Sequence, residues 1–347
     1  MSDPYEYPPP FLLLPRAALA ITNSFEHIRT GWFVIQSLCL IAGGLLLAWW
    51  IGGREGLVVG LLLPAILASI PTMLNFQFGQ FHAMAVMLAI AGMIAFRERR
   101  LALGGALLSF AILSKVFPGV LLVPLAAGRR WREIGWTLVF GVVFVLLGVL
   151  ALGSDPFVAF LSYQLPRIVT VEAFSFIERV DVPVFILSRN FSIYGIVAKL
   201  RLLGVAGVGS ATAQGLTWAY TALVLWLAWR GGRAGTLDRR SQVMLWIGLL
   251  SLASLRSPVA PSAYVTAPFL WLLALLAADV GGSYTMALAV GVAWAVIMGP
   301  PPLPDRIDVF VGLLGQMIAL ALGAWVVVRV DPTLPNKPAS AMQRTAA

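Results

Sequence analysis

Charged residues and cysteines are scarce in this chain of 347 residues. Only 11% of the residues are charged, 60% are hydrophobic, and the mean hydropathy is +0.90. This composition excludes a soluble globular domain, whose surface must be far more polar, and it predicts a membrane protein with several spans. The single cysteine, Cys39, lies inside an apolar run, which excludes a disulfide framework and a cysteine metal site.

Nucleotide-binding fingerprints are also missing. The chain has neither a Walker-type nor a dinucleotide glycine motif, so we expect no nucleotide-driven transport and no hydride transfer. We assign no cofactor and no metal-ligating residue. The formal charge of +9 does not indicate nucleic acid, because the arginines stand in short clusters between apolar segments of spanning length. Such clusters orient membrane proteins, and we expect no nucleic-acid partner.

The apolar runs predict an all-α polytopic membrane protein with about eleven transmembrane or partly inserted helices. The run Leu101–Ala127 is too long for one helix and is cut by Ser114, Lys115 and Pro118, so it predicts two short helices forming a hairpin. Single spans are predicted at Trp32–Ile51, Leu57–Phe76, Phe78–Phe96, Ile134–Gly153, Ala211–Trp229, Gln242–Leu255, Ala263–Ala278, Tyr284–Met298 and Val309–Val330.

We expect one transmembrane domain, residues 1–330, followed by a polar cytoplasmic tail, residues 331–347. Residues 1–31 form a predicted outer segment, in which Phe11–Thr22 is too short to span and is expected to lie at the interface. Residues 154–210 carry most of the internal acids and predict a long outer loop over a membrane cavity, with Ile193–Gly204 as a half-buried helix.

The distribution of basic residues predicts the orientation. With the two arginine clusters Arg97–Arg100 and Arg129–Arg132 placed in the cytoplasm, that side holds 14 Lys/Arg and 6 Asp/Glu, whereas the other side holds 9 of each, leaving aside Arg16. The positive-inside rule therefore predicts a cell-membrane protein with its N-terminus outside and its C-terminus in the cytoplasm. Gln80, His82, Ser114, Lys115 and Arg256 then fall at the outer face.

Gln80, His82, Ser114 and Lys115 are unusual because they interrupt apolar sequence. An ionisable group at membrane depth costs a few kcal/mol and often marks a functional site. An amide, an imidazole and an ammonium together suit a phosphate or a sugar. The structural alternative is helix capping by Gln80 and His82 and a lysine that extends to the interface. Arg256 also has two interpretations: it pairs with an anionic lipid headgroup, or it anchors the helix end at the membrane interface.

Three stretches carry a family resemblance: YEYPPPFLLLPRAALAI, FGQFHAMAVML and RERRLALGGALLSFAILSKVFPGVLLVPLAAGRRWRE. Their order and spacing resemble glycosyltransferase family 87, integral membrane enzymes of the C-type glycosyltransferase fold. The matching features are Tyr7-Pro8-Pro9 before a short apolar helix, Gly79-Gln80, Gly104-Gly105, Lys115 with Pro118, and the closing arginine cluster. The resemblance extends through LRSPVAPSAY to about Leu275.

This resemblance implies a hexosyltransferase that takes a sugar, often mannose, from a polyprenyl-phosphate donor to a lipid-linked or glycan acceptor on the outer face. Membrane lipid, donor and acceptor are the implied partners. The implied substrate-binding residues are Tyr7, Gln80, His82, Lys115 and Arg256, of which Lys115 and Arg256 are the candidate partners of the departing phosphate.

The catalytic base is the part of the family pattern that this chain does not show. In the family a catalytic aspartate lies in an outer loop upstream of the Tyr-Pro-Pro motif, but six residues precede Tyr7 here, and His82 stands where relatives often have Asn. We expect a longer gene product; within this chain the candidates are Asp3 and Glu172. The alternatives are an inactive relative, and a transporter or flippase with Lys115 and His82 lining a pathway.

Overall fold

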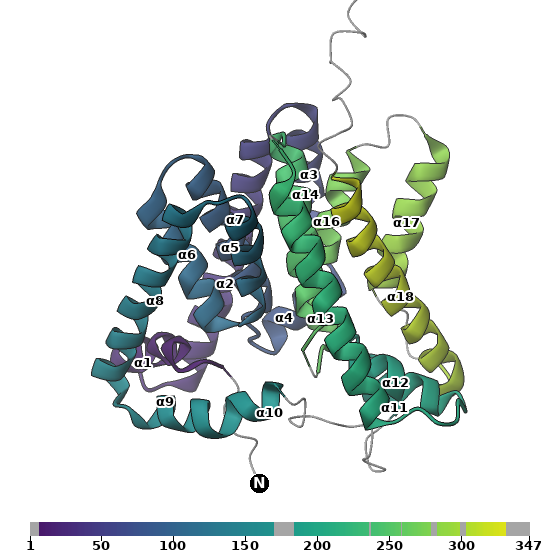
Figure 1. Cartoon of the computed structure of the whole chain (residues 1–347), viewed down its shortest axis with the longest axis horizontal. Coiled ribbons are helices and arrows are strands. Elements are labelled where there is room, and N and C mark those ends of the chain that lie inside the picture. Colours follow the sequence, from purple (N-terminus) through teal and green to yellow (C-terminus); the bar gives the residue numbers. More distant parts are fainter. Residues whose placement is uncertain are drawn as a thin grey trace, which may run out of the picture.

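The computed structural model describes residues 7–169, 184–235, 237–257, 259–278, 283–298 and 303–330. These residues fold into helices, and no strand occurs among them, which confirms the predicted all-α class. Figure 1 shows two groups of helices that stand side by side, α2 with α5 to α8 in one group and α13, α14 and α16 to α18 in the other.

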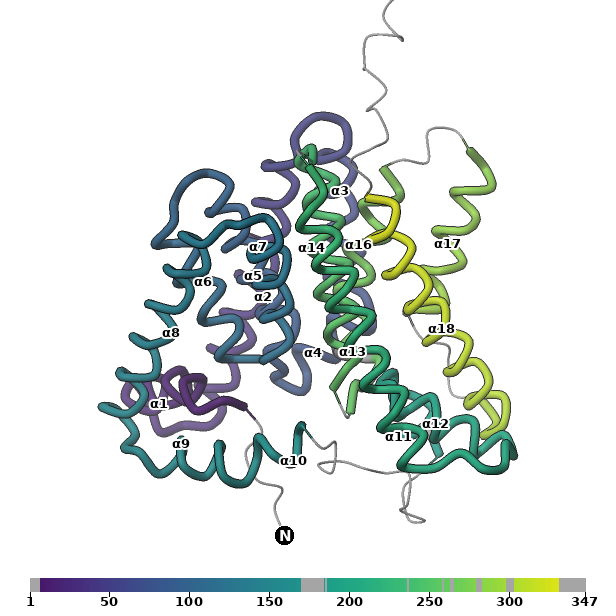
Figure 2. The backbone as a smooth tube through the Cα atoms, viewed as in Figure 1, coloured from purple at the N-terminus to yellow at the C-terminus, as the bar shows by residue number. Residues whose placement is uncertain are grey.

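Figure 2 draws the first half of the chain in purple to teal, and its helix α3 lies beside α16 of the second group. The elements of the first half are η1 (Pro9–Leu12), α1 (Leu13–Ile21), α2 (Phe25–Ile51), α3 (Gly53–Leu67), α4 (Ile70–Gln77), α5 (His82–Arg97), α6 (Leu101–Ser114), η2 (Phe117–Leu121), α7 (Leu122–Ala127) and α8 (Trp131–Leu152).

The second half contains short helices followed by long ones. They are α9 (Asp155–Ala159), the π-helix η3 (Phe160–Gln164), α10 (Leu165–Val169), α11 (Val184–Ser188), α12 (Ile193–Leu202), α13 (Ser210–Arg233), α14 (Arg239–Ser254), α15 (Ser262–Val265), α16 (Ala267–Ala277), α17 (Tyr284–Met298) and α18 (Asp305–Arg329).

Three described helices are long and apolar enough to cross a membrane: α2, α8 and α18. A fourth span results if the bent pair α3 and α4 is counted as one. Most other predicted spans correspond to apolar helices of 10–17 residues, which are shorter than the roughly twenty residues that a straight span needs. The chain is therefore a multi-pass membrane protein, and the count of about eleven inserted helices stays a prediction.

Two predicted spans have different boundaries in the structure. Helix α2 begins at Phe25, inside the predicted outer segment, because the Ser24 side chain accepts a hydrogen bond from the His27 backbone N–H and caps the helix. The predicted straight span Leu57–Phe76 is wrong: α3 and α4 meet at a bend of 55°. Ser69 caps α4 there, and Pro71 in its first turn has no N–H to continue α3.

The predicted hairpin in Leu101–Ala127 is confirmed. Helix α6 ends at Ser114, Lys115 is extended with φ −145° and ψ 125°, and η2 begins at Phe117 with Pro118 in its first turn. Pro118 is tolerated in the first turn of η2 but has no N–H to continue α6, so the break lies in the stretch that the proline interrupts.

The described part of residues 154–210 is helical rather than a simple loop. In Figure 1, α9 and α10 run along the lower end of the molecule, and α11 and α12 lie at the same end beside α18. Helix α12 was predicted as half-buried and is largely buried, with Tyr194, Val197 and Lys199 inside. Glu172 lies outside the described residues.

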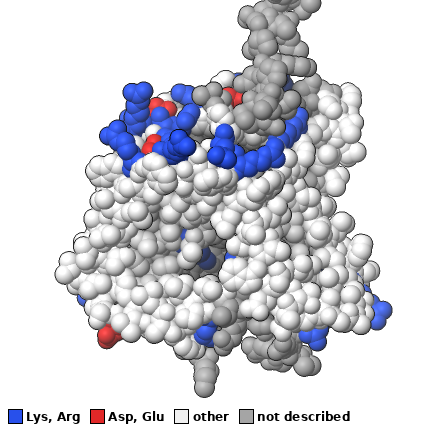
Figure 3. All heavy atoms as spheres, in the orientation of Figure 1, with Lys and Arg blue, Asp and Glu red and all other residues white. Residues whose placement is uncertain are grey.

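The basic loops gather at one end of the molecule, where Figure 3 shows the blue side chains at the top. Arg239 links two of these loops, because it donates to the Trp50 carbonyl oxygen at 3.0 Å and lies 3.8 Å from Glu98. Arg240 lies 3.7 Å from Glu55. Loops that the charge count placed on one side therefore meet at one end.

Candidate active site

A cavity of about 240 Å³ lies between the two groups of helices, at the end away from the arginine loops. It opens between the α5–α6–η2 corner and the segment that follows α14, and Figure 3 shows a hollow with basic atoms in this face. The lining residues are Tyr7, Pro8, His82, Ser114, Lys115, Val116, Phe117, Ile168, Ala253, Ser254, Arg256, Ser257, Val259, Pro261 and Val265.

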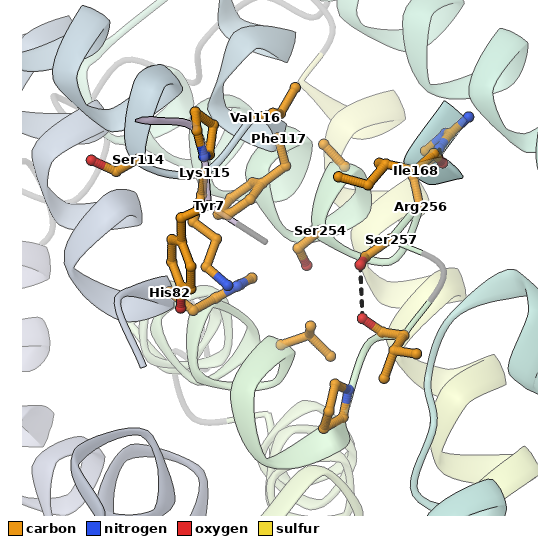
Figure 4. A pocket seen from close by; sticks show the side chains of 15 residues that line it. Tyr7, His82, Ser114, Lys115, Val116, Phe117, Ile168, Ser254, Arg256 and Ser257 are labelled. Atoms are coloured by element: carbon orange, nitrogen blue, oxygen red, sulfur yellow. Dashed lines mark hydrogen bonds between the residues drawn. The ribbon is translucent and has the colours of Figure 1, made fainter. Parts of the chain in front are cut away.

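Three predicted site residues are joined by direct contacts. The Tyr7 hydroxyl donates to Gln80 Oε1 at 2.9 Å, and Lys115 Nζ donates to the same oxygen at 3.5 Å. Lys115 Nζ also lies 4.4 Å from the centroid of the Tyr7 ring, within the range of a cation–π interaction. Residues far apart in the sequence thus hold the ammonium group at the wall of the cavity (Figure 4).

A helix-ending turn places Gln80. Gly79 has φ +62°, the Gly79 N–H donates to Phe76 O at 3.1 Å, and the Gln80 N–H donates to Asn75 O at 2.9 Å. This pair of bonds is the Schellman arrangement, which favours glycine at the left-handed position. Trp32 Nε1 donates to Gly79 O at 3.0 Å and fixes the turn against α2.

His82 begins α5 and stacks on Phe117, with ring centroids 4.6 Å apart and an interplanar angle of 17°. The imidazole is buried, and its Nε2 atom has no hydrogen-bond partner among the described residues. Ser114 Oγ is also buried without a partner within that set. Buried polar atoms are normally hydrogen-bonded, so the unpartnered His82 Nε2 at the cavity wall is suited to a polar ligand, whereas Figure 4 shows the Ser114 hydroxyl directed away from the other labelled residues.

Arg256 lies across the cavity from Tyr7, His82 and Lys115 (Figure 4). Its guanidinium lies 5.5 Å from the Trp218 ring centroid and donates to the Ile168 carbonyl oxygen at 3.5 Å. Burial lowers the pKa of Arg256 and the nearby Tyr194 hydroxyl raises it again. A guanidinium keeps its charge in proteins, so the cavity has one permanent cation on this side and the lysine on the other.

A buried network holds the segment that carries Arg256. Asn190 Oδ1 accepts from the Ala260 N–H at 3.0 Å, and the Phe191 N–H donates to Ala260 O at 2.8 Å. Gln316 of α18 donates to the carbonyl oxygens of Phe191 and Ser192, each at 2.7 Å. These hydrogen bonds place α18 behind the cavity wall to which Ser257, Val259 and Pro261 contribute.

Lys199 completes that network from α12. Its side chain is fully buried, and its Nζ donates to Gln316 Oε1 at 2.8 Å and to the Asn190 carbonyl oxygen. The Asp308 carboxylate accepts a hydrogen bond from the Ser188 hydroxyl and lies 2.8 Å from the Arg189 guanidinium. Burial lowers the pKa of Lys199 to about 7, although the charge of Asp308 opposes this shift.

The structure brings the described site residues that the sequence predicted together at one cavity, although Gln80 does not line it. Tyr7, His82, Lys115 and Arg256 line the cavity, whereas Gln80 supports two of them from behind the lining. Asp3 and Glu172 lie outside the described residues. Sequence reasoning missed these further lining or supporting residues: Phe117, Ser254, Ser257, Lys199 and Gln316.

Among the described residues that line the cavity, none is an aspartate or glutamate. In the same part of the chain, no three His, Cys, Asp or Glu side chains are grouped so as to hold a metal ion. The described cavity thus supplies cations, hydroxyls and an imidazole, which are groups for binding an anion and a sugar.

Comparison with known proteins gives a family match. The model of glycosyltransferase family 87 matches residues 5–258. This range includes all of the lining residues named above except Val259, Pro261 and Val265. Searches of curated proteins and of solved structures find no match. The ordered motifs, the polar cavity at one end of an apolar helical bundle, and a match over most of its length together show that the chain belongs to glycosyltransferase family 87.

Proposed function

We propose that this membrane glycosyltransferase transfers a hexose, with mannose as the first candidate, from a polyprenyl-phosphate donor to a lipid-linked or glycan acceptor at the outer face. The observation that carries the proposal is the placement of Lys115 and Arg256 on opposite walls of one cavity, together with His82, whose Nε2 atom has no partner among the described residues. Two cations and several hydrogen-bonding groups suit a phosphate joined to a sugar.

The reaction breaks one bond and forms another at the anomeric carbon. The acceptor hydroxyl oxygen bonds to that carbon, the bond from the carbon to the phosphate oxygen breaks, and the polyprenyl phosphate leaves with an added negative charge. Lys115 and Arg256 would stabilise that charge as it develops. The acceptor proton passes to a carboxylate base. Lys115 is held for this role by the Tyr7 ring and by Gln80 Oε1.

Asp3 and Glu172 remain the proposed bases within this chain. Each is separated along the sequence from a cavity-lining residue by three intervening residues, Asp3 from Tyr7 and Glu172 from Ile168. Tyr7 and Ile168 themselves line the cavity, which is the reason for testing these two acids. Asp3→Asn and Glu172→Gln distinguish the two candidates, because the true base should lose about a hundredfold or more in rate while donor binding is retained.

The test is transfer of radiolabelled sugar in membranes that contain the full chain, with polyprenyl-phosphate mannose, glucose and galactose offered separately. Lys115→Gln and Arg256→Gln should each lower transfer by about a hundredfold or more, because each removes a charge that stabilises the departing phosphate. Arg132→Gln is the matched control, since it removes a charge from the exposed arginine end. Absence of transfer from all three donors would contradict the proposal.

Transport is the second candidate, and the bend between α3 and α4 is the observation that favours it. Broken helices pointing at a central site are common in transporters. In the described ranges, however, this is the one bent pair that passes the spanning test, whereas inverted repeats would place a counterpart in the other half. Flux of a labelled lipid-linked sugar across proteoliposomes without transfer would favour this candidate.

A further inference from the structure

A second pocket, of about 220 Å³, lies at the arginine end of the molecule and takes no part in the proposed transfer. It is formed where α5, α7 and α13 end and α14 begins. Its lining residues are Met93, Arg97, Pro124, Leu125, Gly128, Arg130, Gly231, Gly232, Ala234, Gly235, Leu237, Gln242, Leu245 and Trp246. Figure 3 shows basic side chains gathered over this end.

Two arginines line this pocket, and only one of them forms an ion pair within the described residues. Arg130 is paired, because its Nη2 lies 2.6 Å from Glu133 Oε1 and also donates to Phe96 O at 3.5 Å. Arg97 is exposed and has no ion pair or hydrogen bond of its side chain within the described residues. The charge of Arg130 repels it, and the charges of Glu133 and Glu98 attract it from a longer distance. A guanidinium held beside a like charge is suited to an anion that both can share.

The acid next to Arg97 in sequence does not supply that anion. Glu98 accepts a hydrogen bond from Trp50 Nε1 at 2.8 Å and lies 3.8 Å from Arg239. Its carboxylate is therefore directed to the loop after α2 and the start of α14. Neither Glu98 nor Glu133 forms an ion pair with Arg97 among the described residues, so the Arg97 guanidinium can take an anionic partner that enters the pocket.

Gln242 is an independent sign of a ligand in the same pocket. Its side chain is only 7% exposed, and its Nε2 donates to the Leu237 carbonyl oxygen at 2.6 Å. Its Oε1 is buried and has no partner among the described residues. An amide oxygen in that state needs a donor, so the ligand must carry a hydroxyl or amine as well as an anionic group.

We propose that this pocket binds the headgroup of an anionic glycerophospholipid, with the phosphate at Arg97 and Arg130 and a headgroup hydroxyl donating to Gln242 Oε1. The pocket volume suits a headgroup of this size, and basic pockets between membrane helices bind anionic headgroups in general. Phosphatidylglycerol has both the required charge and the required hydroxyls. The proposal is independent of the sugar-transfer function, because no residue is shared with the cavity that contains Lys115.

The experiment places the purified full chain in nanodiscs of phosphatidylcholine, with or without added phosphatidylglycerol, and counts retained lipids by native mass spectrometry. Phosphatidylglycerol should be retained and should raise the denaturation midpoint. Arg97→Gln should weaken this retention by about tenfold or more, as expected for a lost charged hydrogen bond. Gln242→Glu keeps the side-chain shape but places a negative charge at the site, and it should weaken retention as well.

Arg132→Gln is the matched control, because this exposed arginine lies at the same end but outside the pocket. It should leave retention unchanged. Glycerol 3-phosphate added to phosphatidylcholine discs distinguishes a lipid from a soluble ligand: stabilisation that depends on Arg97 would support the same chemistry from a soluble source. If neither ligand gives an effect that depends on Arg97, the proposal is overturned.

Discussion

Tyr7 links the segment that begins the described structure to the wall of the cavity. Its ring packs on Phe11, with centroids 4.6 Å apart, and Lys115 Nζ lies over the ring, while its hydroxyl donates to Gln80. These contacts make Tyr7 a positioning residue for the ammonium group. They also explain why an aromatic residue with a hydroxyl suits this position better than phenylalanine or leucine.

Tyr7→Phe keeps the ring under Lys115 and removes the bond to Gln80. Transfer should fall by about five- to tenfold, as expected for one hydrogen bond, whereas Tyr7→Leu should fall further because the cation–π contact is lost as well. Tyr284→Phe is the control, because Tyr284 is 92% exposed. Equal rates for Tyr7→Phe and wild type would show that the bond to Gln80 does not position Lys115.

Single residues of the cavity could be predicted where they break an apolar pattern. Gln80, His82 and Lys115 are found in this way, Arg256 is found from its place at a predicted outer helix end, and Tyr7 comes from the family motif. Phe117 could not be found, because a phenylalanine in an apolar run has no distinguishing signal until its ring is seen against His82. The same holds for Ser254, a small residue inside a helix.

Among the elements, α12 and α18 have a role that their sequences did not reveal. Helix α12 was predicted as half-buried and α18 as one more span, but the bond from Lys199 to Gln316 joins residues 117 positions apart. Local periodicity carries no information about such a contact. Lys199 also donates to the Asn190 carbonyl oxygen, and Asn190 Oδ1 accepts from the Ala260 N–H, so the two helices support the cavity wall indirectly.

The buried Lys199 predicts a pH dependence of stability. Its pKa is lowered in the folded state to about 7 from 10.5, so between these values the unfolded state binds more protons and stability rises with pH. The free energy of unfolding of the wild type, relative to Lys199→Met, should therefore increase from pH 7 to pH 9 by on the order of 1 kcal/mol per unit.

Denaturation midpoints of the purified protein in detergent would measure this difference. Lys115→Met serves as the comparison, because the Lys115 side chain is only partly buried. A difference between wild type and Lys199→Met that is constant with pH would show that Lys199 keeps its full charge in the folded protein.

For the whole molecule, charge distribution predicted which loops lie together. The loops at Glu55, Glu98 and Arg239 meet at one end, and the cavity lies toward the other. The bend between α3 and α4 was not predicted, because Pro64 and Pro71 are both tolerated in membrane helices and their combined effect depends on neighbouring packing.

Orientation can be measured by cysteine labelling, since Cys39 is the single cysteine. In a Cys39→Ser background, Ser154→Cys should react with a membrane-impermeant maleimide in intact cells, and Arg132→Cys only after permeabilisation. Both positions are exposed and lie at opposite ends of α8. The reverse pattern would place the cavity on the cytoplasmic side and exclude transfer at the outer face.

Binding of the donor to purified protein in nanodiscs tests the proposed site most directly, since it does not depend on the catalytic base. A labelled polyprenyl-phosphate hexose should bind to the wild type, and Lys115→Gln and Arg256→Gln should each weaken binding by about tenfold or more, with Arg132→Gln unchanged. Binding that is equal in all four proteins would contradict the assignment of the donor phosphate to this cavity.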